Sequence, residues 1–448
     1  MYLKTIKLIA LIITLSALNA GAQSVTNSPY SRYGIGDLAG QGDGHSLAMG
    51  GVSAAESSPY YLNLLNPAAN TNLFHQRFIF DVGMDVKYTT VSSATASQKN
   101  CNSTFRYLAG GFACKPWWFF TFQLQPYSSV GYSFSDVSKS VYDGTEHTYS
   151  EKFKGVGGLN KVSISTSVKF LKMFSAGVTG SVLFGNLERS HSLVSAMSNG
   201  LVDGYISSVS NNVSYSDKLI MHGLQADLGV RMEKNFRSRK DTLRDAVRIS
   251  LGAFLSCDSK LKCRNEILIN SFHYKSSTSP YFTYQSYSDT VVCDTIHYDR
   301  LKLPGGFGVG LSVEFMERLL LNADYKSYGW SALRLPGHAE TSDMEDSRQL
   351  SAGMQYVYDR YSSRFFRTIN YRVGLYSNES YLKLNGENIK DRGFSFGLGL
   401  PISTIMFNVG AEFGKRGTTE HNLYEEKYFL LNFSITSHDI WFVKRKFM

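Results

Sequence analysis

The stretch FIFDVGMDVKY, residues 78–88, decides the fold, because its side chains alternate between two chemically different faces. Even-numbered positions carry Phe, Phe, Val, Met, Val and Tyr, whereas odd-numbered positions carry Ile, Asp, Gly, Asp and Lys. A period of two with one apolar face predicts a β-strand that meets an apolar phase on one side only.

The alternation recurs along the rest of the chain, for example in residues 224–233, 350–358 and 405–413. In these segments the second face is dominated by Gly, Ser, Asn, Asp and Gln. A soluble β-sandwich also alternates, but its polar face is usually rich in Lys, Glu and Thr. Small and polar side chains instead suit the interior of a barrel that is crowded by a plug. Residues 77–448 are therefore predicted to form an all-β, antiparallel transmembrane β-barrel.

The connections between the predicted strands fall into two classes. Short turns alternate with longer polar loops, which is the pattern of outer-membrane barrels with periplasmic turns and extracellular loops. Strands counted between these markers number 14, with 12 or 16 left open. The short turns are predicted at 114–117, 171–173, 315–318, 359–365 and 400–403, with a longer one at 235–243, and the loops near 93–102, 135–146, 191–206, 271–289, 331–346, 379–390 and 416–424.

Ahead of the first strand lies LAMGGVSAAESSPYYLNLLNPAAN, residues 47–70, which is rich in small and polar residues and shows no regular alternation. Its Gly-Gly pair lets the backbone pass close to another surface, and its Asn-Pro pair is disfavoured within a helix. Such a segment packs as a compact, irregular insert rather than as a strand. Residues 23–76 are therefore predicted to form a plug inside the barrel. The candidate plug and gating residues are Gly50, Gly51, Asn66, Pro67 and Ala68.

The N-terminus has the features of a secretory signal peptide, predicted at residues 1–22. Lys4 and Lys7 form a charged region, and an apolar run follows over residues 8–18. Residues 20–22, Ala-Gly-Ala, supply an A-x-A cleavage site. The apolar run is shorter than the roughly 20 residues that a spanning helix needs, and no cysteine at the cleavage point indicates a lipoprotein. Together with the barrel pattern, these features predict a protein of the bacterial outer membrane.

The positive charge of the chain is spread rather than clustered. Without the signal peptide, 44 Lys and Arg (46 − 2) stand against 37 Asp and Glu, a net charge near +7. Apart from Lys-Arg-Lys at residues 444–446 these residues stand singly, which argues against nucleic-acid binding. Outer-membrane lipid and the acidic headgroups of lipopolysaccharide are the expected partners of such scattered charge. A mean hydropathy of −0.18 suits a barrel, since only every second strand residue faces lipid.

Enzyme and metal motifs are weak, and no catalytic residue, metal site or cofactor is predicted. Residues 393–397 match G-x-S-x-G, but a nucleophile elbow needs a strand-to-helix turn, and here the strand pattern continues. Residues 306–310 resemble part of a dinucleotide loop without the helix that should follow. Cys263 and Cys293 flank one predicted loop and are open to two interpretations, a disulfide bridge or two free thiols. A Ser/His/Asp triad on the barrel wall, as in outer-membrane phospholipases, stays open as a minor alternative.

Motifs spread over most of the mature chain carry a family resemblance. Ala-Met-Gly-Gly at residues 48–51, Tyr-Tyr at 60–61 and Asn-Pro-Ala at 66–68 occur in this order, and a hairpin with FGVGLSVEF and LLLNADYKSYGW follows within residues 303–330. This set resembles the FadL-type outer-membrane transporters of long-chain fatty acids and other hydrophobic compounds. SPYSRYGIGDL and WFVKRKF are similar to a Bacteroidetes-like branch of that family. The resemblance implies a 14-stranded barrel with an N-terminal hatch that contains an Asn-Pro-Ala motif.

The function implied by this resemblance is transport and not catalysis. We expect an outer-membrane channel for passive uptake of hydrophobic or amphipathic small molecules such as long-chain fatty acids. The alternative is a structural or secretion-accessory barrel, similar to the type IX secretion shuttle PorV, that binds a secretion-machinery protein. An apolar pocket in the lumen favours the first function, whereas a lumen lined by Ser, Asn and Asp favours the second or a polar substrate.

Overall fold

The computed structural model describes residues 26–40, 42–142, 145–195, 212–237, 245–275, 285–335 and 344–441. The predicted signal peptide at residues 1–22 and the basic residues 444–446 lie outside the described residues. The same is true of most of the predicted turn at 235–243.

Long strands make up most of the described chain, because the alternating segments pair with their neighbours in sequence. They are β2 (Arg77–Ser92), β3 (Ser97–Lys115), β4 (Trp118–Tyr142), β5 (Thr145–Phe170), β6 (Phe174–Ser195), β7 (Asn212–Arg237), β8 (Asp245–Ser256), β9 (Ser259–Lys275), β10 (Gln285–Leu303), β11 (Gly306–Phe315), β12 (Leu319–Tyr328), β13 (Ser347–Val357), β14 (Asn370–Leu384), β15 (Glu387–Ile402), β16 (Ile405–Gly417) and β17 (Glu425–Ile440).

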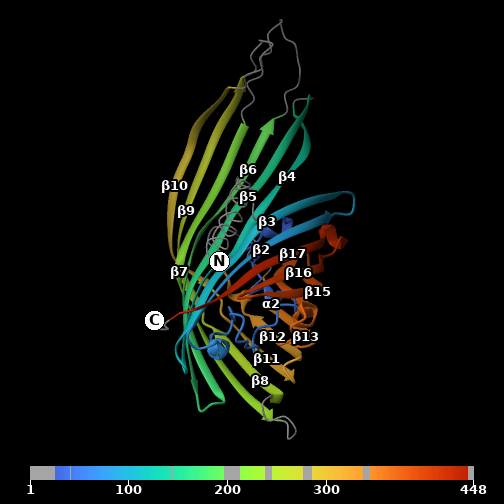
Figure 1. Ribbon diagram of the computed structural model, residues 1–448. Coiled ribbons are helices and arrows are strands. Elements are labelled where there is room, and N and C mark those ends of the chain that lie inside the picture. The colour runs from blue at the N-terminus through green and yellow to red at the C-terminus, as the bar shows by residue number, and fades with distance from the viewer. Residues whose placement is uncertain are drawn as a thin grey trace.

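These strands form one antiparallel sheet that closes into a barrel, since β17 pairs with β2 (Figure 1). Two positions of the wall are each shared by two strands. β7 pairs with β8 along one part and with β9 along another, and β11 pairs with β8 just as β10 pairs with β9. The 16 strands from β2 to β17 therefore occupy 14 positions (16 − 2), and the predicted 14-stranded barrel is confirmed.

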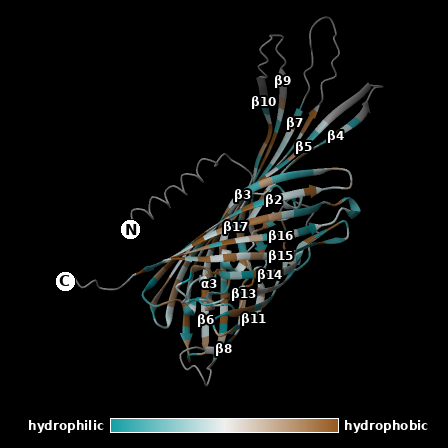
Figure 2. Ribbon diagram, turned by 45° about the vertical axis from the view of Figure 1, so that its right-hand side comes forward, coloured by the Kyte–Doolittle hydropathy of each residue, from teal (hydrophilic) through white to brown (hydrophobic). Residues whose placement is uncertain are grey.

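The two faces of the wall are chemically opposite, as the alternation predicts. On β2, Phe80 and Tyr88 are exposed on the outside, whereas Asp81 and Asp85 are buried on the inside. Figure 2 shows hydrophobic and hydrophilic residues interleaved along the strands. A closed wall satisfies its own backbone hydrogen bonds and can therefore present apolar side chains to lipid. The barrel is thus built as an outer-membrane protein.

Helices are few and short in the described part of the chain. The helices are η1 (Pro29–Arg32), α2 (Gly44–Leu47), η2 (Pro67–Asn72), η3 (Trp330–Ala332), α3 (Phe365–Thr368) and η5 (Glu420–Asn422), and one further short strand, β1 (Asp37–Leu38), pairs with β4. None of these described helices has the length and apolar character needed to cross a membrane. No strand lies between residues 47 and 70, and the predicted irregular conformation of that stretch is confirmed.

The wall is much taller on one side than on the other. β4, β5 and β7 have 25, 26 and 26 residues, whereas β11 and β12 have 10 each. Figure 1 shows β4–β7, β9 and β10 rising above the ends of the strands from β11 to β15. The long strands extend at the end of the barrel where the longer connections lie, and we take this end as the extracellular end.

Three predicted loops are wrong in extent, because strands run into them. Residues 97–102 belong to β3, most of 135–146 belongs to β4 and β5, and the loop predicted near 379–390 is a tight turn between β14 and β15. These parts of the strands carry polar residues on both faces, so no apolar alternation marks them in the sequence. The short turns predicted at 171–173 and 315–318 are confirmed.

All five cysteines are free. The ladder places Cys263 of β9 opposite Tyr298 and Cys293 of β10 opposite Leu268, five residues farther along. At about 3.3 Å per residue this offset is far beyond the Cα separation that a disulfide tolerates. The free-thiol interpretation is the one that the structure supports.

Candidate functional site

Residues 26–40 and 42–76, called the lumen segment below, lie inside the barrel. Their polar atoms bond to inward-facing side chains on widely separated strands. Gly44 N donates to the hydroxyl of Tyr107 on β3 (3.0 Å), and Ser53 N donates to the carboxylate of Asp324 on β12 (2.6 Å). Contacts to strands so far apart in the ring require the segment to cross the lumen.

Glycines on the inner face of the wall let the lumen segment approach the strands closely. A Cβ atom on Gly374 of β14 would lie 2.7 Å from the Cα atom of Met49. A Cβ atom on Gly252 of β8 would lie 2.6 Å from the Cα atom of Ala55. Carbon atoms in ordinary contact are about 3.5–4.0 Å apart. At these two places backbone therefore rests directly on backbone, with no room for a side chain.

The predicted gating pair Gly50-Gly51 forms a tight turn against β14 and β15. The φ angles are +76° and +80°, a region that residues with a side chain rarely adopt. Gly50 N donates to Ser395 Oγ (2.9 Å), and the carbonyl of Gly51 accepts from Lys326 Nζ (2.6 Å). Ser395 is the serine of the G-x-S-x-G match, and its place in β15 confirms the strand interpretation of that motif.

The predicted Asn-Pro-Ala group starts the 3-10 helix η2. Asn66 caps the helix by accepting from Ala68 N (3.1 Å) and also donates to the carbonyl of Ala54 (2.6 Å). Pro67 occupies the first helical position, where its missing N–H costs nothing. A Cβ atom on Gly177 of β6 would lie 2.9 Å from Cβ of Pro67, so the wall makes room for this ring.

The two predicted groups contact different strands of the wall. The Gly-Gly turn contacts β14 and β15 and, through Lys326, β12, whereas the Asn-Pro-Ala turn contacts β6, β7 and β8. The side chain of Asn66 links them, because it bonds to the carbonyl of Ala54, three residues after Gly51. Each group anchors one end of the compact stretch that crosses the lumen between them.

Arg372 of β14 is the largest polar anchor that the sequence analysis missed. Its side chain is buried and donates to Gln355 (2.8 Å), to Asn408 (2.8 Å) and to the hydroxyl of Tyr61 in the lumen segment (2.7 Å). The ring of Tyr61 stacks on that of His45 with centroids 4.2 Å apart. One buried cation thus ties the wall to two aromatic side chains of the segment. The available sign in the sequence was an arginine between Tyr371 and Val373, on the inward face of a strand whose outward face is apolar.

A buried His–Glu pair lies next to this anchor. His45 Nε2 is 3.3 Å from Glu56 Oε1 and 3.1 Å from Gln355 Oε1. Burial, aided by Arg372, lowers the pKa of His45 well below its ordinary value. Burial, aided by the carboxylate of Asp43, raises the pKa of Glu56 well above its ordinary value. Burial therefore favours the neutral form of both groups, which suits a dry contact between segment and wall.

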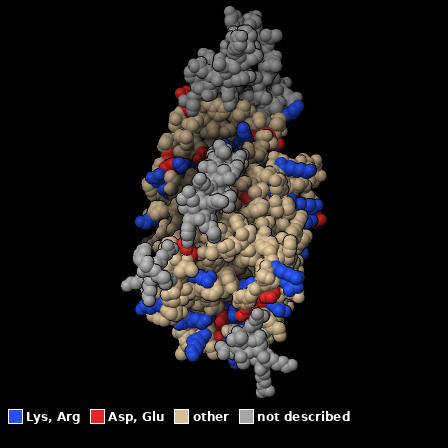
Figure 3. All heavy atoms as spheres, in the orientation of Figure 1, with Lys and Arg blue, Asp and Glu red and all other residues tan. Residues whose placement is uncertain are grey.

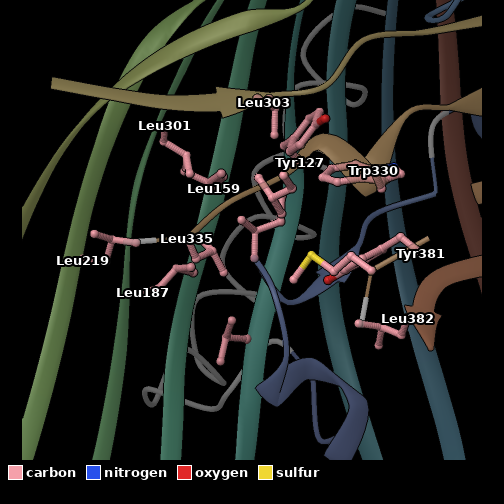
Figure 4. Close-up of a cluster of buried hydrophobic side chains, with 14 of the residues drawn as sticks. Tyr127, Leu159, Leu187, Leu219, Leu301, Leu303, Trp330, Leu335, Tyr381 and Leu382 are labelled. Atoms are coloured by element: carbon pink, nitrogen blue, oxygen red, sulfur yellow. The ribbon is translucent and has the colours of Figure 1, made fainter. Parts of the chain in front are cut away.

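Apolar side chains fill the lumen at its extracellular mouth, above these polar contacts. Figure 4 shows side chains from the tall strands and from the connection after β12 converging on one cluster. The ten labelled side chains are each less than 8% exposed. The labelled members are Tyr127, Leu159, Leu187, Leu219, Leu301, Leu303, Trp330, Leu335, Tyr381 and Leu382.

Two cavities flank this apolar cluster. One, of about 170 Å³, lies inside the barrel and is lined by polar side chains that include Lys326, Asp391 and Arg416. The other, of about 410 Å³, opens at the mouth. Its lining mixes Tyr132 and Phe134 of β4 with polar residues of the β2–β3 hairpin, among them Ser93, Ser97 and Asn100. Only the second reaches the volume of about 300–1,000 Å³ that is common for small-molecule sites.

Within the described chain, no three His, Cys, Asp or Glu side chains are arranged to hold a metal ion.

Solved structures with a similar fold are outer-membrane transport barrels. The chain is 15% identical to the toluene transporter TodX of Pseudomonas putida, with a TM-score of 0.55 over 91% of this chain and 100% of that one. It is 14% identical to the toluene transporter TbuX of Ralstonia pickettii, with a TM-score of 0.52 over 89% and 98%. For a FadL homologue of Pseudomonas aeruginosa the values are 12%, 0.50, 90% and 98%. The predicted resemblance to FadL-type barrels is confirmed at the level of the fold.

No curated protein matches the chain. The family model described as BamG matches residues 3–448, which is nearly the whole sequence. The chain therefore belongs to the BamG family.

Proposed function

We propose that the protein is a passive outer-membrane channel for hydrophobic or amphipathic small molecules, with long-chain fatty acids as one candidate class. The observation that carries this proposal is the apolar cluster at the mouth of the lumen beside a cavity of about 410 Å³. An apolar solute that enters among these side chains gains free energy by leaving water, at about 25 cal/mol for each Å² of apolar area buried. The transport barrels of similar fold, whose described solutes include toluene, give support of the same kind.

In this proposal residues 23–76 form the plug domain and residues 77–448 the barrel. A solute first occupies the mouth cavity and then meets the lumen segment. Passage needs that segment to withdraw from part of the wall, around Gly50-Gly51 on one side and around Asn66, Pro67 and Ala68 on the other. No energy source enters this scheme, because the solute moves down its own concentration gradient.

A disulfide between the lumen segment and the wall tests this proposal. The hydroxyls of Thr71 and Ser175 of β6 are 2.8 Å apart, so cysteines at both positions place two sulfur atoms within bonding reach. The variant is made in a background without the five native cysteines. The matched control joins two wall strands through Ser163 and Ser181, whose hydroxyls are also 2.8 Å apart.

The assay is uptake of radiolabelled oleate and toluene by cells of a host that lacks its own transporter for such compounds. We expect uptake to fall to the level of empty cells when the Thr71–Ser175 bond forms and to return on reduction, whereas the Ser163–Ser181 bond changes nothing. Equal uptake by the oxidised and the reduced form of the Thr71→Cys, Ser175→Cys variant contradicts a gating role for the lumen segment. Absence of uptake by the unlocked protein contradicts the channel itself.

A second candidate function is supported by the uneven height of the wall. β4–β7, β9 and β10 extend beyond the rest of the barrel and expose apolar side chains there, including Val137 and Val291 at 62% and 64% exposure. Such a surface outside the lipid suits an accessory barrel that binds a protein partner, for example one of a secretion machinery. Chemical cross-linking through cysteines placed at Val137 and Val291 tests it. Reproducible capture of one partner, with uptake of apolar solutes absent, favours this second function.

A further inference from the structure

A row of basic side chains crosses the outer face of the barrel near its extracellular end. Arg392 of β15 lies directly opposite Lys415 of β16, and Lys415 lies directly opposite Lys427 of β17. All three are exposed. Like charges that face one another across a sheet destabilise it, so this arrangement needs an opposite charge.

The protein supplies only part of that opposite charge. Glu425 of β17 lies 2.7 Å from Lys415 Nζ and 3.0 Å from Lys427 Nζ. Arg392 pairs with no acidic side chain in the part of the chain that the structure describes. Glu379 of the neighbouring strand β14 pairs with Lys390 (3.6 Å). The row therefore keeps a net positive charge on the outside of the barrel, among the basic side chains that Figure 3 shows at intervals over the surface.

A hollow in the lipid-facing surface begins at Arg392. It measures about 780 Å³ and runs across the outer faces of β8 and β11–β15. Ala323 and Ala352, which lie directly opposite each other on β12 and β13, form the floor of the hollow. Leu350 and Leu375 are among the larger side chains at its sides. Two alanines among leucines leave a depression because they lack the volume of their neighbours.

We propose that the basic row and this hollow together bind one phosphorylated lipid of the outer leaflet that carries several acyl chains. A phosphate group lies on Arg392 and Lys415, and one acyl chain lies in the hollow over Ala323 and Ala352. Basic side chains at a membrane surface attract anionic headgroups, and arginine matches phosphate with two parallel hydrogen bonds. The combination fits a lipid because the cations stand where the apolar outer face ends, one outward position above Phe394 of β15. This inference concerns the outside of the wall and does not depend on transport through the lumen.

The test is native mass spectrometry of the purified, delipidated full-length barrel, titrated with diphosphoryl hexa-acyl lipid A and with the same lipid after removal of its phosphates. The first variant is Arg392→Gln combined with Lys415→Gln, and the second is Ala323→Leu, which fills the hollow. The matched controls are Lys262→Gln on β9 and Ala226→Leu on β7, which are exposed on other strands of the wall. Heat-modifiability on gels confirms that each variant is a folded barrel.

We expect the dissociation constant of lipid A to rise by about fivefold for each cation removed and by about 30-fold for both. Ala323→Leu should also weaken binding, the dephosphorylated lipid should bind less tightly than lipid A, and both controls should bind as the wild type does. Equal affinity for the two lipids, or equal weakening by Lys262→Gln, overturns the proposal. A membrane protein that co-purifies and is lost in Ala323→Leu but not in the Gln variant also overturns it, because the hollow then holds protein.

Discussion

An alanine at Gly374 should lift the lumen segment off β14 while the barrel wall stays closed. The added methyl group would lie 2.7 Å from the Cα atom of Met49 and closer still to its carbonyl carbon. Since carbon atoms in contact are about 3.5–4.0 Å apart, the segment has to withdraw by about 1 Å or more. The wall has less freedom to move, because Gly374 is paired on both sides, with Gly353 and with Ser395.

The size of the effect follows from the cost of overpacking. Extra methyl groups in a packed interior cost about 1–3 kcal/mol, and we place this case in the upper half because the opposing atoms are backbone. The population of the withdrawn state should therefore rise by about 30- to 150-fold. Hydrogen exchange of residues 43–61 measures that population, and exchange within β14 reports on the wall.

The control for this change is Gly180→Ala. Gly180 lies on β6, and a Cβ atom there would meet nothing within 4 Å. Hydrogen exchange of residues 43–61 in the Gly180→Ala variant should equal that of the wild type. Unchanged exchange of this stretch in a folded Gly374→Ala barrel, or the same increase in both variants, would refute the direct contact of backbone on backbone.

Three further predictions concern the polar anchor, its pH dependence and the apolar mouth. Arg372→Met removes three buried hydrogen bonds, to Gln355, Asn408 and Tyr61. At about 1.5–3 kcal/mol for a hydrogen bond to a charged group, it should raise proteolysis of residues 43–61 at least as much as Gly374→Ala does. Burial lowers the pKa of His45, so the docked segment should lose stability as pH falls below about 6.5, where only the released segment takes up a proton. Burial raises the pKa of Glu56, so the docked segment should also lose stability as pH rises above about 4.5, where only the released segment gives up a proton. Between the two values these effects offset each other. Hydrogen exchange corrected for its intrinsic pH dependence should therefore be slowest between these values, and His45→Gln should remove only the acid side of the curve. Trp330 is 1% exposed and packs on Tyr381 with ring centroids 5.0 Å apart. Trp330→Ala should therefore lower the free energy of unfolding by about 3–5 kcal/mol, measured by urea unfolding in lipid vesicles. Trp117→Ala is its control, because the Trp117 side chain is exposed.

Much of the architecture could be read from local patterns, and the misses have one cause. Alternation over residues 78–88 predicted a strand with its outer and inner faces correctly assigned, because lipid on one side imposes a period of two. The same reasoning failed near 135–146 and 379–390, where the strands leave the lipid and neither face needs to be apolar.

The sequence by itself determined the class of protein, the number of strand positions and the irregular stretch that precedes them. These properties depend on which residue types follow one another, and a period of two or a Gly-Gly pair is visible without any partner. Only the tertiary structure decided which wall residues hold the lumen segment. Arg372, Ser395 and Gly374 look like ordinary strand residues in sequence, and closure of the ring is what sets them against Tyr61, Gly50 and Met49, more than 300 positions earlier in the chain. Contacts between such distant positions carry no local pattern, because their geometry is fixed by strand register and by the curvature of the closed sheet.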